Sequence, residues 1–278
     1  MEKTSEILVI LGPTASGKTK LAIDFAKKYN GEVVCADSRS VFVDLDIVSA
    51  KIKKEEMDDI PHHMLDIVLP TEDFSAGEFK NRAEIVIDDI LKRGKTPIVA
   101  GGTWFYVSAL LNFQSIPEVP PNYELREELR EKSNLVLYDM LLELNEKRAR
   151  EINPNNTERI IRAIEIAKSG IKEVKKPEKY SYKLFSTSLD RAELYERINL
   201  RVDKMLAEGL FEEYRKNVEK YGNLKLFSET IGYSEIEKLD NGIYPTKEFA
   251  IDKIKQHTRN FAKRQLTWIK SRDDIEFI

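Results

Sequence analysis

The chain has 278 residues, of which 41% are hydrophobic and 33% are charged, and its formal net charge is -3. This composition is that of a globular protein long enough for one α/β domain with an insertion, or for two smaller domains. It contains no run of about 20 apolar residues that could span a membrane. Cys35 is the only cysteine, which excludes an intramolecular disulfide, and the N-terminal residues show no leader pattern. We therefore expect a cytoplasmic protein without a membrane partner.

The N-terminal part of the chain predicts alternating strands and helices. Short apolar runs that end at glycine or before aspartate predict strands over residues 6–11, 32–36 and 96–100. Apolar residues at the spacing of one helix face predict helices over residues 18–29 and 75–93. A polar loop is expected from the second strand to Pro70. This order is typical of a doubly wound fold with a parallel sheet.

The pattern changes after Asn112. Three prolines between residues 114 and 124 mark an exit from the first domain. From residue 123 to 168 the only signal is charged, leucine-rich helical periodicity, which is clearest over residues 157–168. A lysine-rich linker at residues 172–179 follows.

Strand character then returns at residues 183–189, and the remainder is predicted helical apart from a last strand at 275–278. We therefore expect a core domain formed by residues 1–115 and 181–278. A helical insertion domain, residues 116–180, would interrupt it.

The residues between the first strand and the first helix read GPTASGKT and match the pattern G-x-x-x-x-G-K-[ST]. The glycines permit a tight loop whose N–H groups converge on phosphate oxygens, and the helix start adds its positive dipole end. Lys18 supplies a positive charge, and the Thr19 hydroxyl is placed to ligate Mg²⁺. The predicted phosphate-binding residues are Gly12, Pro13, Thr14, Ala15, Ser16, Gly17, Lys18 and Thr19.

The motif alone suggests an enzyme that uses ATP, but it leaves the reaction open. A kinase, an NTPase and an enzyme that expels diphosphate from carbon all need the same phosphate-binding loop. The reaction has to be inferred from residues at the neighbouring strand ends.

Polar or small residues follow two of the predicted strands. Asp37 and Ser38 come after the second strand, and Gly101, Gly102 and Thr103 end the third. In a doubly wound fold these strand ends lie at the mouth of the sheet. Asp37 could act as a general base, as a Mg²⁺ ligand through water or as a helix N-cap. The glycine turn could allow close approach of a ligand or could be a plain strand-to-helix connection.

The histidines and the cysteine predict little chemistry. His62 and His63 are adjacent in an expected loop, so their side chains point apart, and His257 is the only other histidine. A histidine metal site is therefore not expected. Cys35 alternates with valines and is expected to be a small buried side chain.

Two arginine pairs and one basic segment could bind phosphate or could be solvated surface. Arg159 and Arg162 are three residues apart, and Arg197 and Arg201 are four apart, so each pair shares one helix face. Residues 251–272 carry seven basic side chains against Asp252. The residues alone do not choose between the two interpretations.

Taken together, ten motifs in chain order resemble the tRNA dimethylallyltransferase family, also called tRNA isopentenyltransferases or IPP transferases. The resemblance covers nearly the whole chain. The motifs are GPTASGKT at Gly12, DS at Asp37, LDI at Leu45, PHHMLD at Pro61, FSAGEF at Phe74, GGTWFY at Gly101, NPNNTERIIRAIE at Asn153, LYERINLRVDKM at Leu194, ETIGY at Glu229 and TRNFAKRQLTWIK at Thr258.

The resemblance implies a P-loop NTPase-like doubly wound parallel sheet with a helical insertion domain that contacts tRNA. It implies Mg²⁺-dependent transfer of a dimethylallyl group from dimethylallyl diphosphate to the exocyclic N6 of an adenosine. That adenosine would lie immediately 3′ of the anticodon in tRNAs reading codons that begin with U, with diphosphate released. The expected partners are the anticodon stem-loop of tRNA and dimethylallyl diphosphate, and we expect a monomer.

The resemblance also assigns roles to single residues. It implies that Asp37 is the general base, and that Thr14 and at least one of Arg197 and Arg201 contact the diphosphate. Thr19 would hold the metal. The residues implied to contact tRNA are Asp37, Ser38, Arg39, Ser40, Thr103, Arg126, Glu158, Arg159, Ile160, Ile161 and Arg162.

The chain departs from the family pattern around the expected target base. Ser40 stands where glutamine or leucine is usual, and Phe42 where tyrosine is usual. Residues 48–52 read VSAKI instead of GTAKP. The alternatives to a prenyltransferase are a small-molecule or nucleotide kinase that uses the same P-loop, and a nucleotide-dependent RNA-binding module without catalysis.

Overall fold

The computed structural model describes residues 6–113, 117, 119–171 and 177–278. The chain forms two compact units. Unit 1 consists of Met1–Leu111 and Glu178–Ile278, and unit 2 of Asn112–Pro177. The sequence predicts these boundaries a few residues later, at 115/116 and 180/181. The expected linker falls mostly on residues 172–176, which lie outside the described part.

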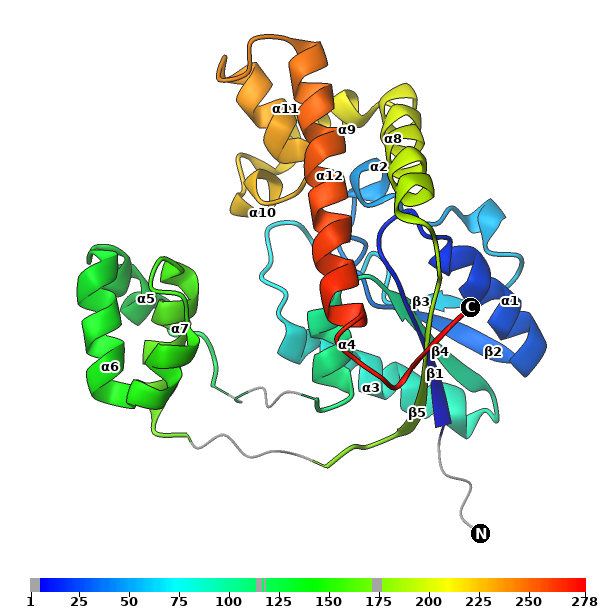
Figure 1. Cartoon of the computed structure of the whole chain (residues 1–278), viewed down its shortest axis with the longest axis horizontal. Helices are drawn as coiled ribbons and strands as arrows, with labels where there is room; N and C mark the ends of the chain where they lie inside the picture. Colours follow the sequence, from blue (N-terminus) through cyan, green and yellow to red (C-terminus); the bar gives the residue numbers. More distant parts are fainter. Residues whose placement is uncertain (1–5, 114–116, 118, 172–176) are drawn as a thin grey trace. The chain divides into compact units, whose positions relative to one another are not determined.

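Unit 1 holds the sheet and most of the helices (Figure 1). Its strands are β1 (Glu6–Leu11), β2 (Gly31–Cys35), β3 (His62–His63), β4 (Thr96–Gly101), β5 (Ser181–Ser186) and β6 (Ile275–Phe277). Its helices are α1 (Lys18–Tyr29), α2 (Asp46–Ser49), α3 (Ala76–Lys92), α4 (Trp104–Leu110), α8 (Arg191–Ala207), α9 (Leu210–Tyr221), α10 (Lys225–Ser228), α11 (Tyr233–Asp240) and α12 (Lys247–Ile269), with a 3₁₀ turn at Lys54–Glu56.

The six strands form one parallel sheet in the order β3-β2-β4-β1-β5-β6. Every residue from Ile7 to Leu11 is buried. This is typical of a parallel strand with helices on both faces. On one face Leu8 and Ile10 pack with Ala22 and Ala26 of α1. The doubly wound α/β fold predicted from the sequence is confirmed.

β4 lies between β1 and β2 although it follows both in sequence. The turn after β4 is therefore placed between the loop that follows β1 and the loop that follows β2. Such a reversal of strand order opens a crevice at the carboxyl ends of the strands, where ligands of doubly wound proteins bind.

The region expected to be a loop up to Pro70 contains α2, the 3₁₀ turn and β3, so this expectation was wrong. These elements are too short to show periodicity. The start of α2 is instead set by a distant residue, because the Glu213 carboxylate accepts hydrogen bonds from the N–H groups of Asp46, Ile47 and Val48. β3 exists because His62 and His63 pair with the edge of β2.

Unit 2 is a three-helix cluster of α5 (Tyr123–Arg130), α6 (Asn134–Glu151) and α7 (Thr157–Ser169). Its core is made of Leu129, Leu137, Leu141, Ile160 and Ile164, with neighbouring apolar residues. α7 ends at Gly170 in the left-handed conformation, as the sequence indicated.

The ends of unit 2 meet, because the Asn112 side-chain amide donates a hydrogen bond to the Pro177 carbonyl at 2.6 Å. Within the described residues no helix combines the length and the hydropathy that a membrane span requires.

Candidate active site

The loop between β1 and α1 has the tight geometry that its glycines predict. Gly17 has φ 90° and caps α1, and Ala15 has φ 61°. A Cβ atom on Gly12 would lie 2.7 Å from Ser16 Oγ and 2.8 Å from Thr187 Oγ1, so no larger residue fits there. The backbone around the loop is therefore packed tightly, while Thr14, Lys18 and Thr19 line an adjoining cavity.

This cavity has a volume of about 360 Å³ and is built entirely within unit 1. Its wall combines the P-loop, the strand-end loops after β2 and β4, and the facing sides of α8 and α12. α8 and α12 lie side by side (Figure 1). All the residues predicted between Asp37 and Ser40 line it, as does Thr103.

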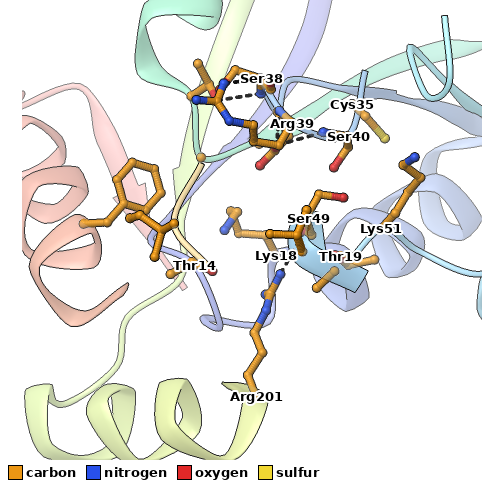
Figure 2. Close-up of a pocket in the computed structure, with 18 of the residues that line it drawn as sticks. Thr14, Lys18, Thr19, Cys35, Ser38, Arg39, Ser40, Ser49, Lys51 and Arg201 are labelled. Atoms are coloured by element: carbon orange, nitrogen blue, oxygen red, sulfur yellow. Dashed lines mark hydrogen bonds between the residues drawn. The ribbon is translucent and has the colours of Figure 1, made fainter. Parts of the chain in front are cut away.

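Lys18 and Arg201 face this cavity, and neither forms an ion pair with another described residue. Lys18 Nζ donates to the Pro13 carbonyl at 2.6 Å, and Arg201 Nη2 donates to the Ser49 carbonyl at 3.2 Å. The Arg201 Nε is buried and has no hydrogen-bond partner among the described residues. Figure 2 shows both side chains pointing toward the same space. The hydrogen-bond partners of both cations are neutral carbonyls, and the one carboxylate of Asp37 attracts both, so the pair keeps an excess of positive charge that favours an anionic ligand.

The pKa values of both cations reflect this environment. Loss of solvation and the nearby Arg201 together lower the pKa of Lys18 to about 7, against the attraction of Asp37. Loss of solvation also lowers the pKa of Arg201, again against the attraction of Asp37. A bound anion would reverse these shifts, since it favours the charged forms.

The structure separates Arg201 from Arg197. Arg201 lines the cavity, whereas Arg197 is exposed outside it and forms an ion pair with Glu193 at 2.7 Å. Arg197 still lies beside the P-loop, because its Nη1 would be 3.9 Å from a Cβ atom on Gly17. The Ser49 carbonyl that receives Arg201 belongs to the unusual VSAKI segment. Because the contact uses the backbone, the change of side chains there leaves it intact.

The two carboxylate oxygens of Asp37 are in different environments. Oδ1 accepts hydrogen bonds from the N–H groups of Arg39 at 2.8 Å and Ser40 at 3.2 Å, which holds the loop after β2 in place. The hydrogen bonds of Asp37 within the described residues use Oδ1 alone. Oδ2 is therefore left to interact with a ligand in the cavity.

Thr103 and Arg39 tie the cavity loops together. Thr103 Oγ1 accepts a hydrogen bond from the Ser38 N–H at 3.0 Å. The Arg39 guanidinium donates to the Ser38 and Glu229 carbonyls at 3.2 and 3.3 Å. Both side chains thus have positioning contacts within the protein, in addition to the tRNA contact expected from the sequence.

One residue of the site was missed by the sequence analysis. Gln265 of α12 is 3% exposed and bonds to both the P-loop and the turn after β4. The segment that contains it was noted for its basic charge and as one of the ten motifs, without a role for Gln265 itself. Its signal was available, since Gln265 shares the buried face of the helix with Ala262 and Ile269. A buried polar side chain on an apolar helix face needs a hydrogen-bond partner.

In unit 2 the predicted tRNA-binding arginines differ in environment. Arg126 and Arg162 both bind the carboxylate of Glu165, which is 2% exposed. Burial tends to raise the pKa of Glu165, but its hydrogen bonds to these arginines and to the Asn122 N–H outweigh it, so the pKa is lowered. Arg159 is exposed on the same helix.

Two residues of that segment cannot offer their side chains to RNA. Ile160 and Ile161 are 0% and 1% exposed and belong to the core of unit 2. The expectation that they contact tRNA is corrected for their side chains. Glu158 is exposed and lies 3.7 Å from Arg130.

The predicted metal ligand, Thr19, is exposed in the cavity wall. Within the described parts of the chain there is no group of three or more His, Cys, Asp or Glu residues that could hold a metal ion. A Mg²⁺ ion bound through one hydroxyl, phosphate oxygens and water needs no such group. The residues present fit that kind of ion.

The remaining candidates have structural partners. His63 Nε2 lies 2.8 Å from the buried Glu32, which also binds Arg93 and Lys95. His62 Nδ1 hydrogen bonds to the Ile60 carbonyl, and burial lowers its pKa. Cys35 was expected to be buried, but it is partly exposed at the cavity wall, where loss of solvation raises its pKa to about 12.

Comparison with known proteins links this geometry to one family. The model of the IPP transferase family matches residues 40–272. A tRNA dimethylallyltransferase of Staphylococcus epidermidis is 41% identical over 286 residues, which cover 98% of this chain and 86% of that protein. One from Exiguobacterium sibiricum is 43% identical over 280 residues, covering 98% of this chain and 89% of that protein.

Solved structures agree with these sequence matches. The full-length tRNA isopentenylpyrophosphate transferase of Bacillus halodurans superposes with a TM-score of 0.75 at 37% identity, covering 99% of this chain and 89% of that one. A eukaryotic dimethylallyltransferase acting on tRNA superposes with a TM-score of 0.84 at 29% identity, covering 99% of this chain and 74% of that one.

Proposed function

We propose, because the chain belongs to the IPP transferase family of tRNA dimethylallyltransferases, that its cavity catalyses prenylation of tRNA. The donor would be dimethylallyl diphosphate. The acceptor would be the exocyclic N6 of the adenosine immediately 3′ of the anticodon, in tRNAs that read codons beginning with U. Diphosphate is the second product.

One observation carries this proposal beyond family membership. A single cavity joins two poorly solvated cations without carboxylate partners, Lys18 and Arg201, to the carboxylate of Asp37. The cations suit a diphosphate that gains negative charge as it leaves. The carboxylate suits an acceptor that must lose a proton.

The acceptor amine needs help because its lone pair is delocalised into the adenine ring. As the bond from N6 to the prenyl carbon forms and the carbon–oxygen bond to diphosphate breaks, N6 becomes acidic. Asp37 Oδ2 takes that proton, while Oδ1 keeps its bonds to the Arg39 and Ser40 N–H groups. The base therefore stays in place while it is used.

The leaving diphosphate would be held by the P-loop N–H groups, Lys18, Arg201 and the Thr14 hydroxyl. Mg²⁺ bound at the Thr19 hydroxyl would supply further positive charge against the diphosphate oxygens. Before the donor arrives, Lys18 bonds to the Pro13 carbonyl. Donor binding would exchange this neutral partner for an anionic one.

The tRNA must present an adenosine that has left its stack. In unit 1 the loop from Asp37 to Ser40 and Thr103 line the cavity and would contact this nucleotide. In unit 2 the exposed Arg159 would contact the phosphate backbone of the anticodon stem. Basic residues of α12 would add a salt-dependent attraction.

The decisive experiment offers the protein two labelled donors in the presence of Mg²⁺. Unmodified tRNA is incubated with labelled dimethylallyl diphosphate or with γ-labelled ATP. We expect label in the tRNA from the prenyl donor only, on the adenosine next to the anticodon. Transfer of the γ-phosphate to a small acceptor, without prenylation, would identify a kinase and refute the proposal. A tRNA with guanosine at that position is the control and should stay unlabelled.

A further inference from the structure

The buried amide of Gln265 connects two loops that are remote from it in sequence. Its Oε1 accepts a hydrogen bond from the Thr14 N–H at 2.9 Å, across 251 residues of sequence. Its Nε2 donates to the Gly102 carbonyl at 2.8 Å. One side chain of α12 thus holds the P-loop and the turn after β4 at a fixed separation.

The strand order explains why this connection reaches Asp37. β4 lies between β1 and β2, so the turn after β4 separates the P-loop from the loop that carries Asp37. Gln265 bridges the first gap. Thr103 bridges the second, because its Oγ1 accepts the Ser38 N–H at 3.0 Å and its own N–H donates to the Ala36 carbonyl at 3.2 Å.

The primary amide of Gln265 satisfies both of its partners. The Thr14 N–H requires an acceptor and the Gly102 carbonyl requires a donor, which fixes the orientation of the amide. Gly102 also leaves room for it, since a Cβ atom there would lie 2.3 Å from Gln265 Nε2. The absence of a side chain on Gly102 therefore gives the Gln265 amide the space that it occupies.

The bond to Gln265 also changes what Thr14 can offer a ligand. In a phosphate-binding loop successive N–H groups point at phosphate oxygens. Here the Thr14 N–H is occupied by Gln265 Oε1. Thr14 lines the cavity, so its hydroxyl is the group left for the diphosphate.

We propose that Gln265 is a positioning residue, which fixes the Thr14 hydroxyl and the P-loop relative to Asp37 during prenyl transfer. This proposal rests on the function proposed above. Gln265 acts through Thr14 and the turn after β4, so its loss misaligns donor and base without removing any diphosphate contact. Such misalignment lowers kcat and leaves the KM for the donor nearly unchanged.

The first test replaces Gln265 by methionine, which keeps length and volume but has no amide. We expect Gln265→Met to lower kcat about 100-fold, the cost of a displacement of about 1 Å at a reacting centre. The donor KM should change by less than about threefold, and thermal unfolding should remain cooperative. Thr267→Ala on the exposed side of α12 is the matched control and should keep wild-type kinetics.

The second test uses Gln265→Glu and remains informative if the methionine variant folds poorly. An ionised glutamate turns an acceptor toward the Gly102 carbonyl, whereas a protonated one has the donor and the acceptor that the amide supplied. The ratio of kcat between Gln265→Glu and wild type should therefore rise as pH falls. The ratio for a folded Gln265→Met should stay flat.

These experiments separate the two proposals. If the wild type transfers no prenyl group to tRNA, both proposals fall. If the wild type is active and folded Gln265→Met has the same kcat, or if the Gln265→Glu ratio does not depend on pH, the positioning role alone is refuted.

Discussion

Among single residues, the polar groups of the site have partners within the protein that still leave an atom or a charge available to a ligand. Asp37 uses Oδ1 to hold its own loop, which leaves Oδ2 for a substrate. Lys18 and Arg201 rest against carbonyl oxygens, which are weak partners for a cation and can be exchanged for an anion. The hydrogen bonds that position Asp37, Lys18 and Arg201 therefore do not use up the groups that the reaction requires.

The substitution Asp37→Asn should separate the two roles of Asp37, which are to hold its loop and to accept a proton. Asp37→Asn keeps an oxygen that can accept from the Arg39 and Ser40 N–H groups but cannot take a proton. We expect kcat to fall by about 10²–10⁴-fold, with tRNA affinity close to wild type. Asp37→Ala loses both tasks and should also weaken tRNA binding through the loosened loop. Near-normal turnover by Asp37→Asn in single-turnover assays would rule out a base at this position.

Donor binding should depend on pH through Lys18. Its pKa of about 7 in the free protein means that the ammonium is charged below pH 7 and loses its proton above it. Diphosphate binds the charged form better, so the Kd for the donor should rise as pH increases above 7, by at most about tenfold per unit. The donor's own charge changes little there, because a terminal phosphate has its second pKa at about 6.

Lys18→Arg provides the control for this pH dependence, because a guanidinium stays charged over the whole range. Calorimetric titration of both proteins with dimethylallyl diphosphate, from about pH 6.5 to about pH 9, measures how the Kd for the donor changes with pH. A profile that is equally steep in Lys18→Arg would assign the pH dependence to another group.

At the scale of elements, α7 shows how one helix combines a structural face with a surface for binding. Ile160 and Ile164 face the core of unit 2, and the neighbouring Glu165 draws Arg162 and Arg126 into a buried ion-pair network. Burying a carboxylate is costly unless several donors compensate it. Arg126 thus ties α5 to Glu165 of α7, and Arg162 ties α7 to the Val119 carbonyl, whereas Arg159 remains exposed.

Alanine substitutions at Arg159 and Arg162 should affect different properties, tRNA binding for Arg159 and the stability of unit 2 for Arg162. Arg159→Ala should weaken tRNA binding and reduce the slope of log affinity against log salt by about 1, with unchanged thermal stability. Arg162→Ala should destabilise unit 2 by about 1–3 kcal/mol, since Glu165 loses one of its partners. Denaturant unfolding and salt-dependent tRNA binding distinguish them. Equal losses of stability would contradict the division of roles.

At the scale of the whole molecule, the chain leaves unit 1 at Leu111 and returns at Glu178. The hydrogen bond between Asn112 and Pro177 brings the two ends of unit 2 together. An insertion with adjacent ends can be added to a sheet without disturbing its strand order. The cavity that holds Lys18, Asp37 and Arg201 is lined by unit 1 alone.

Removal of unit 2 should therefore preserve the diphosphate site. If residues 112–177 are replaced by a short glycine–serine linker, unit 1 should fold with native circular dichroism and bind dimethylallyl diphosphate with nearly unchanged affinity. Its affinity for tRNA should fall at least about tenfold through the loss of phosphate contacts. Failure of the shortened protein to fold would show that the sheet depends on unit 2.

Features that are local along the chain could be predicted from the amino-acid sequence. The P-loop could be found because its glycines, Lys18 and Thr19 are contiguous and sit between a strand and a helix. β1, α1, α3 and α7 could be predicted because their apolar spacing and end signals lie within each element. Asp37 was found as a candidate because it directly follows a strand.

Which of the remaining candidates share a site depends on how the chain folds. Gln265 meets Thr14 from 251 residues away, and the same folding brings Arg201 into the cavity while it leaves Arg197 outside. Glu213 starts α2 from a distance of more than 160 residues, and Glu165 gives the expected tRNA contacts Arg126 and Arg162 an additional partner within the protein. Except for the bond between Arg162 and Glu165, these outcomes depend on hydrogen bonds between segments far apart in the sequence, and the identity of such a partner leaves no periodic or contiguous trace.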